Sequence, residues 1–199
     1  MQLKKGDFIE IEYVGRLTDS KDIFDLTSGE LAKKEGIFNP RAQYKPQIIC
    51  LGEGRVVKGL DEFLIGKEEK KKYSVPLLPE QAFGKKDAKL LKIVPLNTFT
   101  KQKIKPVPGL RVNLDGALGT IKTVSGGRIL VDFNHPLSGK TIVYQIKIIR
   151  KIEDDKEKLK GFLQMMGIAS DPTIEEGKAT VEFNLPEEAQ KQLAGKIKD

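Results

Sequence analysis

The stretch that decides the fold is L-G-E-G-R-V-V-K-G-L-D-E-F-L-I-G, residues 51–66. Glycines lead into it and Gly66 ends it, so the pattern predicts a short helix between turns. Its apolar residues recur at a helical spacing and share one face: Val56, Val57, Leu60, Phe63 and Leu64. We expect Lys58, Asp61 and Glu62 to remain in water. A lone helix this short is unstable, so it must pack against the strand-like segments on either side.

Those neighbouring segments alternate between apolar and polar residues, which is typical of half-buried strands. Residues 8–17 place Ile9, Ile11 and Tyr13 on one face, and residues 141–152 place Ile142, Tyr144, Ile146 and Ile148 on one face. Shorter strands are predicted at 47–51 and 72–78, and a helical turn with a capping signal at 27–34. Together these segments predict an α+β fold, in which an antiparallel β-sheet wraps around the short helix.

The sequence pattern changes near residue 88, and beyond it Pro95, Pro106 and Pro108 interrupt any regular element. Turn signals at Asp115-Gly116 and at 125–127 separate short strands predicted at 120–124 and 128–133. We predict a small β-rich domain, residues 88–132, inserted into a main domain of residues 1–87 and 133–153. Because the chain returns to the main sheet after the insert, the two ends of the insert must lie close together.

Residues 154–199 form a predicted C-terminal extension of small α/β type. We expect a charged linker at 154–158, helices at 159–166 and 187–198, and a strand at 178–184. Four apolar residues share one face of the first helix: Leu159, Phe162, Leu163 and Met166. This is more apolar surface than so short a segment hides, and no strand closes the extension after its last helix. Either a further segment or a partner is therefore expected, most simply a second copy of the chain in a two-fold dimer.

Composition sets broad limits on the protein. Its 199 residues are 39% hydrophobic and 32% charged, which suits a globular protein with a modest core. No apolar run is long enough to span a membrane, the N-terminus has no signal-peptide pattern, and Cys50 is the only cysteine, so we expect a cytoplasmic address without membrane contact. Abundant Lys and Glu without Trp are typical of hyperthermophiles, which suggests an archaeal source. The net charge of +7 could indicate nucleic-acid or ribosome contact, although a solvated Lys-rich surface is the simpler interpretation.

Four motifs in order resemble the FKBP-type peptidyl-prolyl cis-trans isomerases. The stretch 51–66 is similar to the helix at the floor of that family's pocket. Residues 13–17 with Phe24-Asp25 match Y-x-G-x-L…F-D, and residues 79–84 match P-E-x-A-[YF]-G. The run Asn134-His135-Pro136 through Lys140, with Tyr144, resembles the SlyD-like branch, whose flap carries an inserted domain. Each motif alone is weak, but their order makes the resemblance specific.

The resemblance implies an enzyme that rotates X-Pro bonds in unfolded or proline-containing polypeptides, without metal or cofactor. The pocket positions it implies are Tyr13, Phe24, Asp25, Val56, Val57, Leu60, Phe83 and Tyr144, with Ile49 at the rim. In this scheme the Val57 amide holds a substrate carbonyl and Leu60 floors the pocket. Taken singly, such apolar residues are more often core than pocket. His135 is most simply a turn residue.

Two positions depart from the family pattern. Leu60 stands where many members carry Trp, and Phe83 stands where Tyr is frequent. The apolar character that rotation needs is retained, whereas tight binding of macrolide inhibitors is not expected to follow.

The insert is unusually rich in apolar residues between 93 and 110: Ile93, Val94, Leu96, Phe99, Ile104, Val107 and Leu110. In SlyD-like proteins such an insert is the chaperone site that binds unfolded chains. The resemblance therefore implies client binding through Ile93, Val94, Leu96, Phe99 and Leu110. The alternative, that these residues only form the core of the small domain, is equally compatible with the sequence.

Two further interpretations stay open at this point. One is a holdase-type chaperone whose isomerase pocket is weak. The other is an RNA- or ribosome-binding module at residues 109–133, whose short strands and basic residues suit a small barrel. Phe133 is the single aromatic residue of that stretch, and base stacking would need more.

Overall fold

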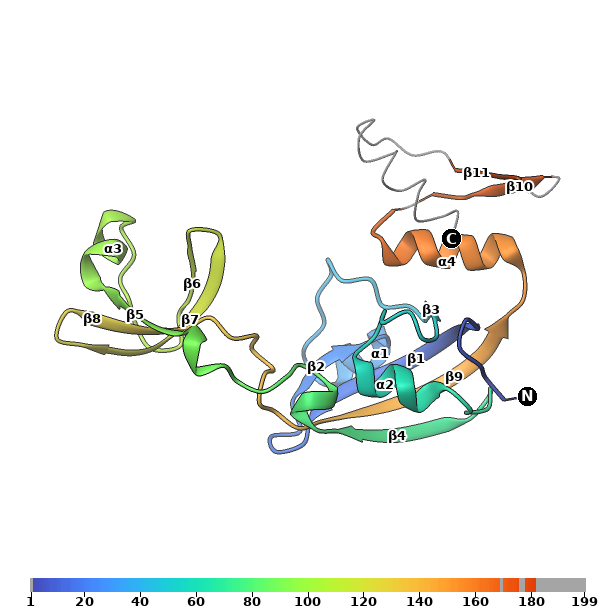
Figure 1. Ribbon diagram of the computed structural model, residues 1–199, viewed down its shortest axis with the longest axis horizontal. Coiled ribbons are helices and arrows are strands. Elements are labelled where there is room, and N and C mark those ends of the chain that lie inside the picture. The colour runs from blue at the N-terminus through green and yellow to red at the C-terminus, as the bar shows by residue number, and fades with distance from the viewer. Residues whose placement is uncertain (1, 169, 176–177, 182–199) are drawn as a thin grey trace. The chain divides into compact units, whose positions relative to one another are not determined.

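The computed structural model describes residues 2–168, 170–175 and 178–181. The chain forms two compact units, drawn with their elements in Figure 1. The first unit comprises the residues up to Arg16, Lys21–Val75 and the residues from Val143 onward. The second comprises Leu17–Ser20 and Pro76–Ile142, and so holds the whole of the predicted insert. The expected helix at 187–198 and the end of the expected strand at 178–184 lie outside the described residues.

The main sheet has the order β2-β1-β9-β4, with β3 also paired to β1 (Figure 1). Its strands are β1 (Phe8–Leu17), β2 (Ile23–Leu26), β3 (Gln47–Cys50), β4 (Lys72–Leu77) and β9 (Ile142–Ile152). Strand β1 pairs antiparallel with β2 through Val14 and Gly15, and with β3 through residues 8–11. The bounds of β1, β3, β4 and β9 match the predicted strands, whereas β2 was not predicted. The α+β class is confirmed.

The alternation along the strands buries one face of this sheet. Ile9, Ile11, Ile146 and Ile148 are all at most 2% exposed. Each fully buried side chain of this size contributes about 1.5–3 kcal/mol relative to exposure. The small helices α1 (Gly29–Lys34) and α2 (Lys58–Leu64) complete the first part of this unit. The N-cap of α1 is Ser28, whose hydroxyl oxygen accepts a hydrogen bond from the Leu31 amide at 3.3 Å.

Helix α2 is shorter than the apolar spacing predicts. Val57 is its N-cap residue and Val56 precedes it, so these two side chains belong to the incoming loop and not to the helix face. Leu60 and Leu64 are buried as expected. Asp61 was expected in water, but it is only 6% exposed. Its carboxylate accepts hydrogen bonds from the Gly52 amide at 2.8 Å and the Gly54 amide at 3.0 Å, which explains why burial is tolerated.

The predicted linker at 154–158 is wrong. Asp154 caps helix α4 (Asp155–Met165) by accepting a hydrogen bond from the Glu157 amide at 2.8 Å, and the acidic residues form the first turn. The helix packs against β3 of its own chain and buries Leu163. The short strands β10 (Thr173–Glu175) and β11 (Lys178–Thr180) follow and pair antiparallel. Part of the apolar face of α4 is thus covered within one chain. The expected dimer stays a prediction.

The second unit contains a four-stranded antiparallel sheet in the order β5-β8-β7-β6 (Figure 1). Its strands are β5 (Leu91–Pro95), β6 (Arg111–Leu114), β7 (Ala117–Ser125) and β8 (Arg128–Asp132). Short 3₁₀ turns at Pro79–Gln81 and Ala88–Leu90 precede it. The two hairpin turns are the ones predicted: Asp115 and Gly116 have φ of 51° and 83°, and Gly126 and Gly127 have 52° and 76°. Positive φ at both central residues is the type I′ geometry that Asp-Gly and Gly-Gly favour.

The core of this sheet forms on one face and centres on Phe99, which is fully buried. Phe99 lies on α3 (Leu96–Lys101), a helix that the proline-rich sequence did not suggest. The other buried members are Val112, Leu114, Ile121, Ile129 and Val131, with Val94, Ile104, Leu110 and Phe133 packed at the margin. None of the helices that the structure describes is long and apolar enough to cross a membrane.

Candidate functional site

Three aromatic rings from three strands meet in the first unit. The ring of Tyr144 on β9 lies 5.7 Å from that of Tyr13 on β1 and 5.7 Å from that of Phe24 on β2. Both contacts are edge-to-face, with interplanar angles of 75° and 84°. The sheet therefore brings together three of the predicted pocket residues, from positions far apart in the chain.

Gly15 makes this aromatic cluster possible. A Cβ atom on Gly15 would lie 2.6 Å from Cζ of Phe24 and 3.0 Å from Cε1 of Tyr144. Both distances are shorter than non-bonded carbon atoms tolerate, so any side chain here would displace the Phe24 ring. The glycine of the Y-x-G motif is thus explained by the close approach of the rings to β1.

Asp25 is tied to the cluster through the hydroxyl of Tyr13. That hydroxyl donates a hydrogen bond to Oδ2 of Asp25 at 3.0 Å. Burial raises the pKa of Tyr13 first, and the charge and hydrogen bond of Asp25 raise it further. The pKa of Tyr144 is raised too, by burial and then by the charge of Asp25. Both phenols therefore remain neutral, and Tyr13 remains a hydrogen-bond donor, throughout the physiological pH range.

Tyr13 also lines a cavity of about 460 Å³. Ile49 of β3 and Val56 of the loop before α2 line the same cavity, so three predicted site residues share it. The other lining residues are Gln47, Gly54, Arg55, Gln164 and Met165. This volume suits a peptide segment of one or two residues.

The loop that carries Val56 is held by the buried carboxylate of Asp61. Its two hydrogen bonds to the Gly52 and Gly54 amides fix the backbone that leads to Val56 and Val57. Sequence reasoning missed Asp61, although a signal was present: Asp61 lies three residues before Leu64 and so on its buried face.

A larger hollow of about 620 Å³ lies over residues of β1, β4 and β9. Charged side chains contribute to its lining, among them Glu12 and Lys147, whose carboxylate and ammonium groups are 3.5 Å apart. Tyr13 lines this hollow as well, but neither Ile49 nor Val56 does. The smaller cavity is lined by three predicted site residues and the larger hollow by Tyr13 alone, so the smaller cavity is the better candidate.

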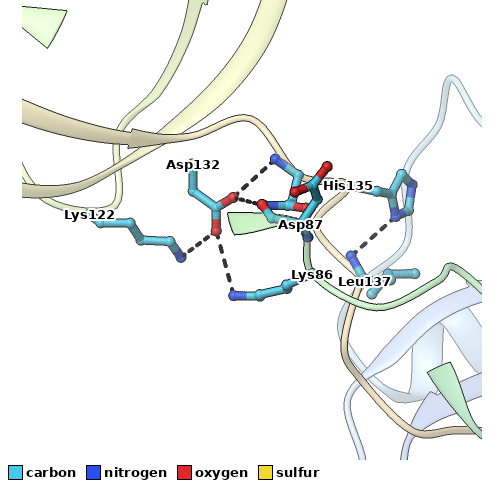
Figure 2. Close-up of polar contacts among 7 residues, drawn as sticks. Lys86, Asp87, Lys122, Asp132, His135 and Leu137 are labelled. Atoms are coloured by element: carbon cyan, nitrogen blue, oxygen red, sulfur yellow. Dashed lines mark hydrogen bonds and ion pairs between the residues drawn. The ribbon is translucent and has the colours of Figure 1, made fainter. Parts of the chain in front are cut away.

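Phe83 lies in the second unit. Its ring stacks on His135, with the ring centroids 4.7 Å apart and an interplanar angle of 3°. The Ser138 hydroxyl donates a hydrogen bond to the Phe83 carbonyl at 2.9 Å. Nδ1 of His135 accepts from the Leu137 amide at 3.2 Å, as expected for a turn residue (Figure 2). The role of Phe83 in the pocket stays a prediction.

A polar network joins the two chain segments that enter and leave the small sheet (Figure 2). The Asp87 amide donates to Oδ1 of Asn134 at 2.8 Å, and Nδ2 of Asn134 donates back to the Asp87 carbonyl at 3.0 Å. Asp132, 6% exposed, accepts two hydrogen bonds from Asn134 and faces the ammonium groups of Lys86 and Lys122 at 3.5 and 3.7 Å. The two connecting segments are therefore fastened to each other.

The predicted client residues divide between the surface and the core of the small sheet. Ile93 is 66% exposed and Leu96 is 37% exposed. Phe99 is fully buried, and Val94 and Leu110 are packed at the edge of the core. Leu118 of β7, outside the predicted apolar run, is 74% exposed. The core interpretation therefore holds for Phe99, and client binding through the exposed residues stays a prediction.

Among the residues that the structure describes, no group of three or more His, Cys, Asp or Glu side chains could hold a metal ion. The predicted site residues brought together are aromatic and aliphatic, with one carboxylate and two phenol hydroxyls. Such a site can exclude water and stabilise a dipole, which is what rotation about an amide requires.

Comparisons with known proteins agree with this chemistry. The sequence profile of the FKBP-type peptidyl-prolyl cis-trans isomerases matches residues 1–100, and the profile described as FKBP26, IF domain, matches residues 92–137. A short-type peptidyl-prolyl cis-trans isomerase of Methanocaldococcus jannaschii is 30% identical over 146 residues, covering 73% of this chain and 92% of that protein. The SlyD protein of Helicobacter pylori is 26% identical over 152 residues, covering 75% of each chain. The FKBP-type 16 kDa isomerase of Escherichia coli K12 is 29% identical over 129 residues, covering 63% and 81%. The chain belongs to the FKBP-type peptidyl-prolyl cis-trans isomerase family.

Proposed function

We propose that X-Pro bonds rotate in the cavity bounded by Tyr13, Ile49 and Val56, beside the rings of Phe24 and Tyr144. The observation that carries the proposal is the convergence of the aromatic cluster and this cavity on Tyr13. Rotation breaks amide resonance and has a barrier of about 18–20 kcal/mol. Apolar walls lower it, because the twisted imide is less polar than the planar one and loses less when water is excluded.

Asp25 acts through position and charge. The hydrogen bond from Tyr13 holds its carboxylate at the edge of the aromatic cluster. There the carboxylate can stabilise the twisted state, or orient donors of the substrate that face the rotating bond. Val57 is the N-cap residue of α2. The first N–H groups of a helix have no partner within the helix, so the Val57 amide is free of the helix ladder. We propose this amide as the donor to a substrate carbonyl. Leu60 supports this loop from within the core.

The substrates are polypeptides, and we propose that the second unit binds them while they are unfolded. This proposal is supported by the exposed apolar surface of β5, which is the edge strand of the small sheet. Ile93 projects from the outer face opposite Leu130 of β8, and Leu91 on the same face is 39% exposed. An edge strand with exposed apolar side chains can accept an extended chain through both backbone and side chains. Phe133 packs against the core of this unit, which disfavours base stacking and hence the RNA-binding alternative.

One experiment separates the two proposed sites. Rates are measured on a proline tetrapeptide, by a protease-coupled assay, and on a refolding reaction limited by proline isomerisation. Phe24→Ala should lower both rates about tenfold or more, because it removes a wall of the pocket. Ile93→Ser should leave the tetrapeptide rate unchanged and slow catalysed refolding about fivefold, because the unfolded chain loses its second contact.

Leu118→Ser is the matched control, since it removes an even more exposed apolar side chain from β7 of the same sheet. Circular dichroism checks that each variant is folded. A folded Phe24→Ala protein with the full tetrapeptide rate would place catalysis elsewhere. Equal refolding rates for the parent and Ile93→Ser proteins would exclude β5 as the client site.

A further inference from the structure

Helix α4 supplies part of the cavity wall. Gln164 and Met165, at the end of α4, line the same cavity as Tyr13, Ile49 and Val56. Met165 is half-buried and Gln164 is exposed. Helix α4 lies beyond residue 137, where the second of the two family matches ends. Neither of the two family profiles therefore covers this wall.

Helix α4 is fastened to the sheet near its N-terminus. The guanidinium of Arg150 on β9 donates from Nε to Glu10 of β1 at 2.8 Å and from Nη1 to Glu157 of α4 at 2.8 Å. Nη2 of Arg150 bonds the second oxygen of Glu157, so the pair is bidentate. Bidentate pairs of this kind restrict orientation as well as distance, and they set the direction in which α4 runs.

The middle and end of α4 are held by close packing. Gly161 lies so near β3 that a Cβ atom would be 2.6 Å from Cγ2 of Ile48. The guanidinium carbon of Arg55, in the loop that carries Val56, lies 5.2 Å from the centre of the Phe162 ring. Lys45 donates from Nζ to Oε1 of Gln164 at 3.2 Å. Met165 is thus positioned by contacts on both sides of the cavity.

We propose that α4 forms one wall of the substrate groove and that Met165 selects for an apolar side chain flanking the substrate's proline. The inference rests on the proposed function, because the cavity must be the isomerase pocket for its wall to touch substrate. The occupant follows from continuity: a polypeptide with its proline against Tyr13 and Val56 places a flanking residue within the same cavity. A thioether adapts to different apolar shapes, as an enzyme acting on many sequences requires.

The test uses the full chain and proline tetrapeptides that carry Ala, Leu or Glu immediately before or immediately after proline. We expect the parent to prefer Leu over Ala at one of these two positions, measured as kcat/KM. Met165→Ala should reduce that preference about fivefold, because the contact with the larger side chain is lost. Met165→Leu, which keeps the apolar bulk, should retain the preference. Met166→Ala is the matched control, since Met166 is the neighbouring half-buried methionine and does not line the cavity.

A positive charge at position 165 should increase the rate on an acidic peptide. A variant that merely loses structure would not show such an increase. Met165→Lys should raise kcat/KM about fivefold for the Glu peptide relative to the Ala peptide at low salt. If Phe24→Ala leaves all rates unchanged, the proposed pocket is wrong. If Phe24→Ala lowers the rates but neither Met165→Ala nor Met165→Lys alters the preference, the pocket stands and the role of α4 is refuted.

Discussion

Replacing Asp61 by Ala tests how the loop before α2 is held. The carboxylate is 6% exposed and accepts two hydrogen bonds, at 2.8 and 3.0 Å, from the amides of Gly52 and Gly54. A hydrogen bond to a charged group contributes about 1.5–3 kcal/mol. Gly54 is exposed, so its amide can bond to water after the substitution, and the lower end of that range applies. We therefore expect Asp61→Ala to lower the free energy of unfolding by about 3 kcal/mol, or roughly a hundredfold in the folding equilibrium.

The same substitution should affect catalysis through the position of Val56 and Val57. Without the carboxylate, a residue of this loop becomes free to move, which corresponds to about 1–2 kcal/mol of backbone conformational entropy (as TΔS). This entropy must be lost again when substrate binds. A fall of about tenfold in kcat/KM on a proline tetrapeptide is therefore expected. Urea unfolding followed by circular dichroism gives the stability. Hydrogen exchange at the Gly52 and Gly54 amides, which should become faster, locates the change.

The neighbouring Glu62 provides the control. Glu62 is exposed on α2 and forms only a loose pair with Lys58, at 3.8 Å. Such exposed pairs contribute less than about 1 kcal/mol, so Glu62→Ala should have little effect on stability or rate. Asp61→Asn, which keeps one acceptor oxygen, should fall between the two. If the free energy of unfolding of Asp61→Ala lies within about 0.5 kcal/mol of the parent value, the carboxylate does not hold the loop and this explanation is refuted.

Two further predictions concern the aromatic cluster and the small sheet. Gly15→Ala should lower the tetrapeptide rate about tenfold by displacing Phe24, whose Cζ would lie 2.6 Å from the new Cβ; a crystal structure with an unmoved ring would contradict this. Asp132 should stabilise the second unit above its unfolded pKa of about 3.9, because hydrogen bonds from Asn134 and nearby Lys charges outweigh burial and lower its folded pKa. That stability is lost as pH falls through the folded pKa, so urea midpoints measured at pH 6 and pH 3 should differ less in Asp132→Asn than in the parent. An unchanged pH dependence would exclude Asp132 as the source.

The family and most strands were predictable from local sequence. Side chains alternate between the two faces of a strand, so the sequence alone places Ile9, Ile11 and Tyr13 on one face. The neighbouring strand need not be known. The turns at Asp115-Gly116 and Gly126-Gly127 were predictable because few residues accept positive φ. The ordered motifs placed Tyr13, Phe24 and Tyr144 in one site, and the rings do meet.

Long-range contacts decided the rest. The burial of Asp61 depends on two loop amides that reach its carboxylate, and helix periodicity carries no information about such partners. The charged run at 154–158 resembles a linker by its composition, and only the contact of the Arg150 guanidinium with Glu157 shows that α4 is joined to the sheet. Met165 enters the cavity because Gly161 lets α4 lie against Ile48 of β3. Local pattern determines which face of an element is apolar, whereas only the packed structure determines which distant residue covers it.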